Sequence, residues 1–222
     1  MSHGRGGPNP ADRARRWLVV GLVILVAALG LTVVAAGAGT APGDIAIARA
    51  MQRPPSEQLD AAAHIISDVG DEFPAMALMA LVGVALLLRH GWRDLALFLA
   101  IAAALRVLGP VLKVLINSPR PTLEAVIVVA QADGLGFPSG HALGAALFYG
   151  AIAVIAPQAI GGPMVVRAIQ ALAVVMMMLV AWSRVRLGVH WPSDVAGGLL
   201  YGLGLVCLVQ AAFLAWQSRV RT

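Results

Sequence analysis

Six apolar runs, each near the length that a helix needs to cross a bilayer, constrain this chain more than any other feature of its sequence. A bilayer core takes about 20 apolar residues of helix. The runs are Trp17 to Ala38, Phe73 to Leu88, Leu95 to Leu115, Ala142 to Ile155, Ala168 to Ala181 and Val195 to Trp216. They predict an all-α fold, a polytopic bundle of six transmembrane helices.

The composition excludes several other classes of protein. Of the 222 residues, 59% are hydrophobic and 12% are charged, which leaves too little polar surface for a soluble globule and too few charges for a disordered chain. The 16 Lys and Arg residues are scattered singly or in pairs, so we expect the lipid bilayer as partner and no nucleic acid. The single cysteine, Cys207, lies inside an apolar run and argues against a disulfide or a Cys-based metal site.

Arginine gathers at alternate ends of these runs, which predicts the orientation. The residues concerned are Arg5, Arg13, Arg15, Arg16, Arg89, Arg93, Arg167, Arg219 and Arg221. Because positive charge marks the cytoplasmic side, we expect both termini in the cytoplasm, in a bacterial inner membrane. Residues 1–16 are then a disordered cytoplasmic tail, 17–216 a single membrane domain, and 217–222 a second tail. Residues 39–72, 116–140 and 183–193 face the opposite side.

The first 72 residues carry two further expectations. The first run has a cleaved secretory signal as its alternative, because arginines precede it and small residues follow. Its length exceeds the 7 to 15 apolar residues usual in a signal, which favours a retained span. After Pro54 and Pro55, the segment Ser56 to Asp60 could cap a short helix on the membrane surface.

A second group of polar residues lies at the outer ends of the last four spans. Its members are Lys113, Arg120, Ser139, His141, Ser183, Arg184, Arg186, His190 and Asp194. Taken singly, a cation at a helix end can snorkel to the interface, and an acid after a proline is common at a helix start. Ionisable groups at membrane depth are costly and usually face one another. Their gathering at one level therefore predicts a site.

Part of this group is suited to an oxyanion. Arg120 stands between two prolines, which hold its guanidinium out from a stiff loop. Lys113, the chain's single lysine, precedes it by about two helical turns. Ser139 and Gly140 come before the fourth apolar run, where exposed helix amides favour an anion.

The other part is suited to nucleophilic catalysis. His190 and Asp194 are four residues apart, so the carboxylate can hold one ring nitrogen and leave the other free. With His141 they could instead bind zinc, but Lys113, Arg120 and Arg184 would repel a divalent cation and attract a phosphate. We therefore expect phosphoryl chemistry with no metal and no cofactor.

These residues resemble the signatures of the type 2 phosphatidic acid phosphatase superfamily, which includes bacterial acid phosphatases, glucose-6-phosphatase and vanadium haloperoxidases. The signatures appear in order: Lys113 with Arg120-Pro121, then Pro138-Ser139-Gly140-His141, then Ser183-Arg184 with His190 and Asp194. The match spans residues 113–194. Arg186 lies outside it and is left as a substrate-side or helix-end cation.

The resemblance implies a role for each residue. His190 is the nucleophile that forms a phosphohistidine, Asp194 orients it, and His141 is the general acid. The phosphoryl oxygens are bound by Lys113, Arg120, Ser139, the Gly140 amide and Arg184.

A site at the outer ends of membrane helices favours a lipid phosphate or diphosphate as substrate. Undecaprenyl diphosphate is the first expectation; phosphatidylglycerophosphate, phosphatidic acid and lipid A 1-phosphate fit the same chemistry. Two other functions are weighed: a non-catalytic lipid-phosphate binder or transporter, which needs no oriented histidine, and a vanadate-dependent haloperoxidase, whose relatives are soluble. The oligomeric state stays open.

Overall fold

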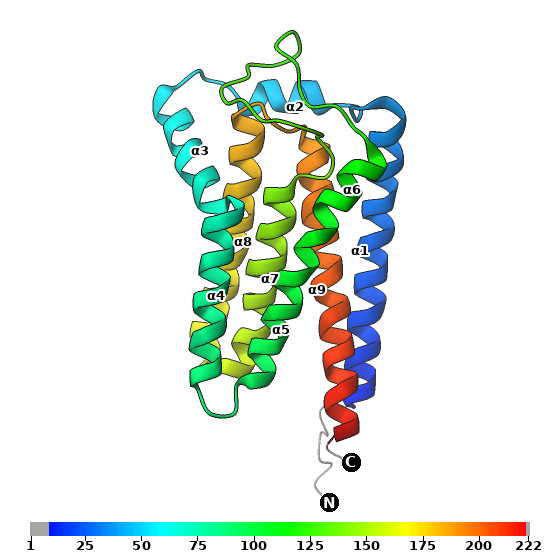
Figure 1. The fold of residues 1–222 in the computed structure, drawn as a ribbon, viewed down its shortest axis with the longest axis vertical. Coiled ribbons are helices and arrows are strands. Elements are labelled where there is room, and N and C mark those ends of the chain that lie inside the picture. The colour runs from blue at the N-terminus through cyan, green and yellow to red at the C-terminus, as the bar shows by residue number, and fades with distance from the viewer. Residues whose placement is uncertain (1–8, 221–222) are drawn as a thin grey trace, which may run out of the picture.

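The computed structural model describes residues 9–220, and helices are the only regular secondary structure in that range. The elements are α1 (Pro10–Ala38), α2 (Asp44–Met51), α3 (Glu57–Gly70), α4 (Glu72–Leu88), α5 (Arg93–Ala104), the 3₁₀ turn η1 (Leu105–Val107), α6 (Leu108–Ile116), α7 (Gly140–Ala159), α8 (Pro163–Arg186) and α9 (Pro192–Val220). The long helices run side by side in one bundle, and α2 lies across one end of it (Figure 1).

The predicted membrane-spanning helices are confirmed. Among the described residues, five helical segments are long and apolar enough to cross a bilayer: α1, α7, α8, α9, and the continuous stretch Arg93–Ile116. Helices α3 and α4 count as a sixth span when the pair, which is bent by 52° at its break, is taken as one segment. The apolar run beginning at Phe73 thus forms only the inner part of its span, and polar α3 forms the rest.

The boundaries of the outermost helices differ from the predicted tails. Helix α1 begins at Pro10, inside the segment expected to be disordered, because Asn9 accepts a hydrogen bond from the Ala11 amide and proline suits a first helical position. Helix α9 continues to Val220, beyond the expected start of the second tail. Residues 1–8, 221 and 222 lie outside the described residues.

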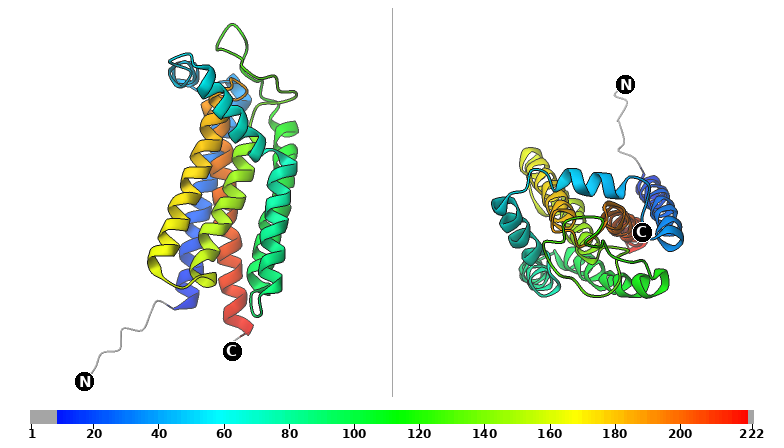
Figure 2. Two further views of the ribbon diagram at one scale, coloured as in Figure 1. Left: turned by 90° about the vertical axis from the view of Figure 1, so that its left-hand side faces the viewer. Right: turned by 90° about the horizontal axis from the view of Figure 1, so that it is seen from above.

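Helix α7 occupies the centre of the bundle and contacts α5, α8 and α9 (Figure 2). Its approach to α9 is close because α9 presents glycines. A Cβ atom on Gly198 would lie 2.5 Å from the Ser139 carbonyl oxygen, and one on Gly202 would lie 2.5 Å from the Ala146 Cβ. Small residues at such interfaces are how membrane helices gain close packing.

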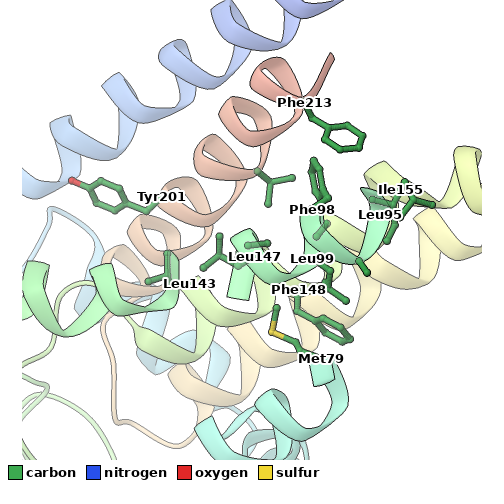
Figure 3. Close-up of a cluster of buried hydrophobic side chains, with 14 of the residues drawn as sticks. Met79, Leu95, Phe98, Leu99, Leu143, Leu147, Phe148, Ile155, Tyr201 and Phe213 are labelled. Atoms are coloured by element: carbon green, nitrogen blue, oxygen red, sulfur yellow. The ribbon is translucent and has the colours of Figure 1, made fainter. Parts of the chain in front are cut away.

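The apolar core packs α7 against α4, α5 and α9. Phe98 and Leu147 are fully buried, and the Phe98 ring meets the Phe213 ring edge to face at a centroid distance of 5.7 Å (Figure 3). Aromatic pairs favour this geometry. This core fixes α7, whose first turn carries His141, against its neighbours.

The two ends of the bundle differ in character. The start of α1, the α4–α5 turn, the α7–α8 turn and the end of α9 lie together at one end (Figure 1). We call this the arginine end, because it carries Arg13, Arg15, Arg16, Arg89, Arg93, Arg167 and Arg219. Helix α2, residues 117–139 and the α8–α9 connection lie at the opposite end, where the predicted site residues are found.

Candidate active site

A cavity of about 600 Å³ opens at the end opposite the arginine end. Six of the predicted site residues line it: Lys113, Arg120, Gly140, His141, Arg184 and His190. They come from α6, the 117–139 loop, the start of α7, the end of α8 and the α8–α9 connection. Ser139 and Asp194 are fully buried behind this wall and are not among the lining residues.

His190 and Asp194 form a pair at the start of α9. The Nδ1 atom of His190 lies 3.3 Å from Oδ2 of Asp194, which also accepts a hydrogen bond of 3.0 Å from the Trp191 amide. Gly188 permits the tight turn before them: its φ is 68°, and a Cβ there would lie 2.1 Å from the Ile127 carbonyl oxygen. The ring is held by Nδ1, which leaves Nε2 for chemistry.

Arg120 lies directly beside the free nitrogen of His190. Its Nη1 atom is 3.2 Å from Nε2 of His190 and donates a 2.7 Å hydrogen bond to the Val189 carbonyl. Its Nε and Nη2 atoms donate to carbonyl oxygens of Asp133 and Gly134, which fixes the guanidinium to the loop. Partial burial lowers the pKa of Arg120 below its ordinary value. The group still carries its charge at neutral pH.

Burial is the main cause that lowers the pKa of His190 well below its ordinary value of 6.5, and nearby Arg120, Arg184 and Lys113 lower it further. The ring is therefore neutral at neutral pH. A neutral imidazole with one nitrogen held by a carboxylate has a lone pair at the other, which is the state that a nucleophile needs.

Two further cations complete the wall. The Nζ atom of Lys113, in the last turn of α6, donates a 2.7 Å hydrogen bond to the Leu135 carbonyl. Arg184, in the last turn of α8, donates from Nη1 to the Ser67 hydroxyl, and its buried Nε has no hydrogen-bond partner among the described residues. A buried guanidinium donor without a partner is costly. It can be satisfied by an anion held in the cavity.

Ser139 has a structural position in this arrangement. Its side chain caps α7 by accepting from the Ala142 amide at 3.5 Å, and its own amide donates to the Asp194 carbonyl at 3.0 Å. The first turns of α7 and α9 are thereby joined. The expected contact between the Ser139 hydroxyl and a phosphoryl oxygen stays a prediction, because this hydroxyl lies at the cap of α7 and not at the cavity wall.

The α3–α4 break supplies a wall of the cavity that the sequence did not assign. His64, Ser67, Asp68 and Asp71 all line it. The Ser56 cap predicted for a helix is present, with its hydroxyl accepting from the Leu59 amide. The signal for the wall was the spacing of these four residues, at 64, 67, 68 and 71, which places polar side chains on one face of a helix.

Arg186 does not lie on the substrate side. Its side chain is buried, forms an ion pair of 2.7 Å with Asp60, and donates to the carbonyl oxygens of Met51, Pro54 and Ser56. It ties the α2–α3 link to the end of α8. Of the two options left open for this residue, the substrate-side cation is wrong.

The site is therefore electropositive and built around one neutral histidine. Among residues 9–220, no three His, Cys, Asp or Glu side chains are grouped so that they could hold a metal ion. Lys113, Arg120 and Arg184 face the cavity with His190 between them. This arrangement can bind a phosphoryl group and present a nitrogen nucleophile to it.

Comparisons with known proteins identify the family. Residues 91–218 match the model of the PAP2 superfamily. The chain is 31% identical over 148 residues to phosphatidylglycerophosphatase B of Bacillus subtilis, covering 65% of this chain and 70% of that protein. It is 32% identical over 154 residues to decaprenylphosphoryl-5-phosphoribose phosphatase of Mycobacterium tuberculosis, covering 68% and 78%.

A solved structure extends the likeness to the whole bundle. The crystal structure of a transmembrane PAP2 type phosphatidylglycerolphosphate phosphatase from Bacillus subtilis aligns with a TM-score of 0.76 and 27% identity. The alignment covers 90% of this chain and 96% of that one. The resemblance inferred from the three signatures is therefore confirmed, and the chain belongs to the PAP2 superfamily as an integral-membrane phosphatase.

Proposed function

We propose that this protein is a metal-independent lipid phosphatase that acts through a phosphohistidine formed on His190. One observation carries the proposal: Nδ1 of His190 is held by Asp194 while Nε2 lies beside Arg120 in a cavity lined by three cations. Binding alone would need the cations but would not need a neutral, oriented imidazole.

The chemistry follows from these positions. Lys113, Arg120 and Arg184 bind the phosphoryl oxygens and stabilise the charge that develops on them in the transition state. His190 attacks phosphorus through Nε2, and His141 gives a proton to the leaving oxygen, a contribution of about 10² to 10⁴ in rate. Water then hydrolyses the phosphohistidine. Dividing hydrolysis into two displacements at one site requires no metal.

The substrate is proposed to enter the site laterally from the bilayer. A second cavity of about 630 Å³ shares Asp71, Lys113, Gly140 and His141 with the first. It continues between α4 and the stretch from α5 to α6, along the apolar residues Met76, Ala103, Ala104 and Val107. An amphiphile can place its chain along this apolar side and its phosphate among the cations. A soluble sugar phosphate would leave the apolar part unused.

The chemical class of the substrate is a lipid that ends in a phosphate. The two relatives that align over most of their length are named for phosphatidylglycerophosphate and for decaprenylphosphoryl-5-phosphoribose, both phosphate esters of a lipid-linked polyol. These names favour a terminal phosphomonoester. A third relative, a putative undecaprenyl-diphosphatase of Escherichia coli that is 51% identical over 47 residues, supports undecaprenyl diphosphate, which is therefore tested beside them.

The cavity is proposed to face the periplasm or cell exterior from the inner membrane of a bacterium. The clustering of arginines at the other end of the bundle supports this orientation by the positive-inside rule. A lipid phosphate of the outer leaflet would then reach the site directly.

Phosphate release from detergent-solubilised protein tests the function. The panel is undecaprenyl diphosphate, phosphatidylglycerophosphate, phosphatidic acid and lipid A 1-phosphate, each in excess EDTA. We expect release from at least one lipid, a phosphohistidine trapped by rapid quench, and neither product with His190→Ala. His90→Gln, in the exposed α4–α5 turn at the arginine end, is the matched control and should behave as the wild type.

The outcomes separate the proposal from its alternatives. A strict need for a divalent metal would contradict a metal-independent reaction. Lipid-phosphate binding with no release and no phosphohistidine would instead identify a binder or transporter. Near-normal turnover by His190→Ala would remove this residue as the nucleophile.

A further inference from the structure

His141 has a carboxylate partner that its sequence motif does not contain. The Nε2 atom of His141 lies 2.6 Å from Oδ1 of Asp71. The two residues are 70 positions apart in the chain, and Asp71 stands at the break between α3 and α4. Two of the three histidines that line the cavity are therefore each paired with an aspartate, His190 through Nδ1 and His141 through Nε2.

The bend of the sixth span brings this carboxylate to the ring. A Cβ on Gly70 would lie 3.3 Å from Cδ2 of His141, so the imidazole packs directly against the backbone at the break. The 52° bend then turns the next residue, Asp71, toward the first turn of α7. On the same helix, Ser67 accepts from Arg184. Residues at and just before the α3–α4 break thus contact both Arg184 and His141, the proposed general acid.

The charged groups around His141 show why the Asp71 carboxylate matters for the protonation of this ring. Cations face the ring from three elements, Arg184 on α8, Arg106 on η1 and Lys113 on α6, and His190 and Asp68 line the same cavity. Burial first, and then the cations, disfavour the protonated form of this imidazole, whereas a carboxylate in contact favours it. A general acid must carry its proton when the substrate is bound.

We propose that Asp71 is the positioning residue of the general acid: it holds Nε2 of His141, stabilises the imidazolium, and leaves Nδ1 as the atom that transfers the proton. This inference rests on the proposed function. In the first step, Nε2 of His190 bonds to phosphorus, the bond to the leaving oxygen breaks, and the Nδ1 proton of His141 passes to that oxygen. His141 becomes neutral and keeps its Nε2 proton, which stays hydrogen-bonded to Asp71.

The same contact prepares the second step. Neutral His141 keeps its proton at Nε2 because Asp71 accepts it there, so the lone pair is at Nδ1. Water attacks the phosphohistidine, its proton moves to Nδ1 of His141, and the bond between phosphorus and nitrogen breaks. Phosphate leaves, His190 regains its lone pair and His141 is again an imidazolium. One hydrogen bond therefore fixes the tautomer for both steps.

Leaving-group dependence tests this role in the full-length protein. Asp71→Asn keeps the shape of the side chain but removes its charge. We expect kcat on a lipid phosphate, whose alkoxide must be protonated, to fall by about 10²-fold. The pre-steady-state burst of 4-nitrophenolate from 4-nitrophenyl phosphate, which reports the first step alone and whose leaving group departs as an anion, should keep its wild-type rate. Glu57→Gln, an exposed acid at the far end of α3, should match the wild type on both substrates.

A charge-restoring variant gives a second test that uses the lipid alone. Asp71→Glu should recover part of the activity that Asn loses, because a carboxylate again meets the ring. A steric role would show the opposite order, since Asn matches the shape of Asp better than Glu does.

Different results would contradict the proposed phosphatase function and the proposed role of Asp71. If the wild type releases phosphate from none of the four lipids, the proposed function fails. If the wild type is active and Asp71→Asn slows the first step by the same factor with both substrates, or with neither, only the role of Asp71 is overturned.

Discussion

The Oδ2 atom of Asp194 lies 3.3 Å from Nδ1 of His190 and 3.0 Å from the backbone nitrogen of Trp191. One carboxylate oxygen thus holds both the ring and the chain segment that carries it. Because Pro192 begins α9, the carboxylate also lies in the first turn of a long buried helix. The orientation of His190 is therefore fixed by a residue of helix α9 and not by the surface loop.

Asp194→Asn should test this relationship. An amide can donate toward Nδ1 and so favour the wrong tautomer of His190, as occurs when the triad aspartate of a serine protease is replaced, where the loss is about 10⁴-fold. We expect kcat to fall by about 10² to 10⁴, with formation of the phosphohistidine slowed in a rapid-quench experiment. Asp12→Asn, an exposed acid in the first turn of α1, should have wild-type rates. Normal phosphorylation by Asp194→Asn would refute the orienting role.

The position of Arg120 predicts how activity depends on pH. The pKa of His190 lies well below 6.5, through burial first and Arg120 second, so the neutral nucleophile persists as the pH falls through 6.5. The acid limb of kcat/KM should therefore lie below this value in the wild type. Removing the guanidinium in Arg120→Gln stabilises the imidazolium, raises the pKa of His190 and moves the acid limb to higher pH.

The pH profile needs a control for the loss of substrate binding, since Arg120 also contacts the phosphate in the proposed mechanism. A binding defect alone lowers kcat/KM at every pH, whereas the electrostatic effect displaces the limb. Arg53→Gln, an exposed arginine between α2 and α3, should leave the profile in place. An acid limb that does not move in Arg120→Gln would contradict the predicted coupling.

Two arginines that stand two residues apart on α8 should have separable effects. Arg184 faces the cavity, so Arg184→Gln should lower kcat/KM by about 10²- to 10³-fold, as expected for removal of one donor to a developing oxyanion. Arg186 ties down the α2–α3 link through Asp60, so Arg186→Gln should lower the free energy of unfolding by about 2 kcal/mol, less than for a fully buried pair because Asp60 is partly exposed.

The comparison uses the initial rate and the thermal unfolding temperature of each variant, measured in the same detergent as the wild type. We expect Arg184→Gln to unfold near the wild-type temperature and Arg186→Gln to keep its rate per folded molecule. If both variants lost rate and stability together, the division of roles between the two arginines would be wrong.

The sequence predicted the spans and most of the cavity because both depend on local signals. Apolar length determines each span. The outer ends of the last four spans must then lie at one level, which brought Lys113, Arg184 and His190 together without any knowledge of the helix packing. Lys113 and Arg184 lie in the last turns of their helices, and His190 lies just before the start of α9.

The α3–α4 wall was harder to predict because its span is only half apolar. A polar helix such as α3 is expected at the membrane surface, and hydropathy places the span at the later run from Phe73. The contact between Asp71 and His141 joins residues 70 positions apart and depends on the angle of a bend. The role of Arg186 was missed for the same reason, since its partners lie more than 100 positions away along the chain.

The glycine contact between α7 and α9 predicts a large effect of a small substitution. A Cβ on Gly202 would lie 2.5 Å from the Ala146 Cβ and 2.8 Å from the Leu143 carbonyl oxygen, so Gly202→Ala must push the helices apart. Overpacking of this kind costs about 1–3 kcal/mol. The unfolding temperature should fall by roughly 2–4 °C for each kcal/mol in a chain of this size.

Gly30→Ala in α1 is the matched control for that substitution. A Cβ there meets nothing within 4 Å, and alanine is the better helix former. Its unfolding temperature should equal or exceed that of the wild type. Equal losses in the two variants would show that the α7–α9 contact does not depend on the absence of a side chain.

The proposed orientation can be tested because the chain has one cysteine, Cys207, and this residue is buried. In a Cys207→Ala background, Glu124→Cys places a thiol on the exposed loop at the cavity end, and His90→Cys places one in the exposed α4–α5 turn at the arginine end. A membrane-impermeant maleimide should label position 124 in intact spheroplasts. Position 90 should react only after permeabilisation, because arginines mark the cytoplasmic side. The reverse pattern would place the cavity in the cytoplasm, and the substrate would then have to come from the inner leaflet.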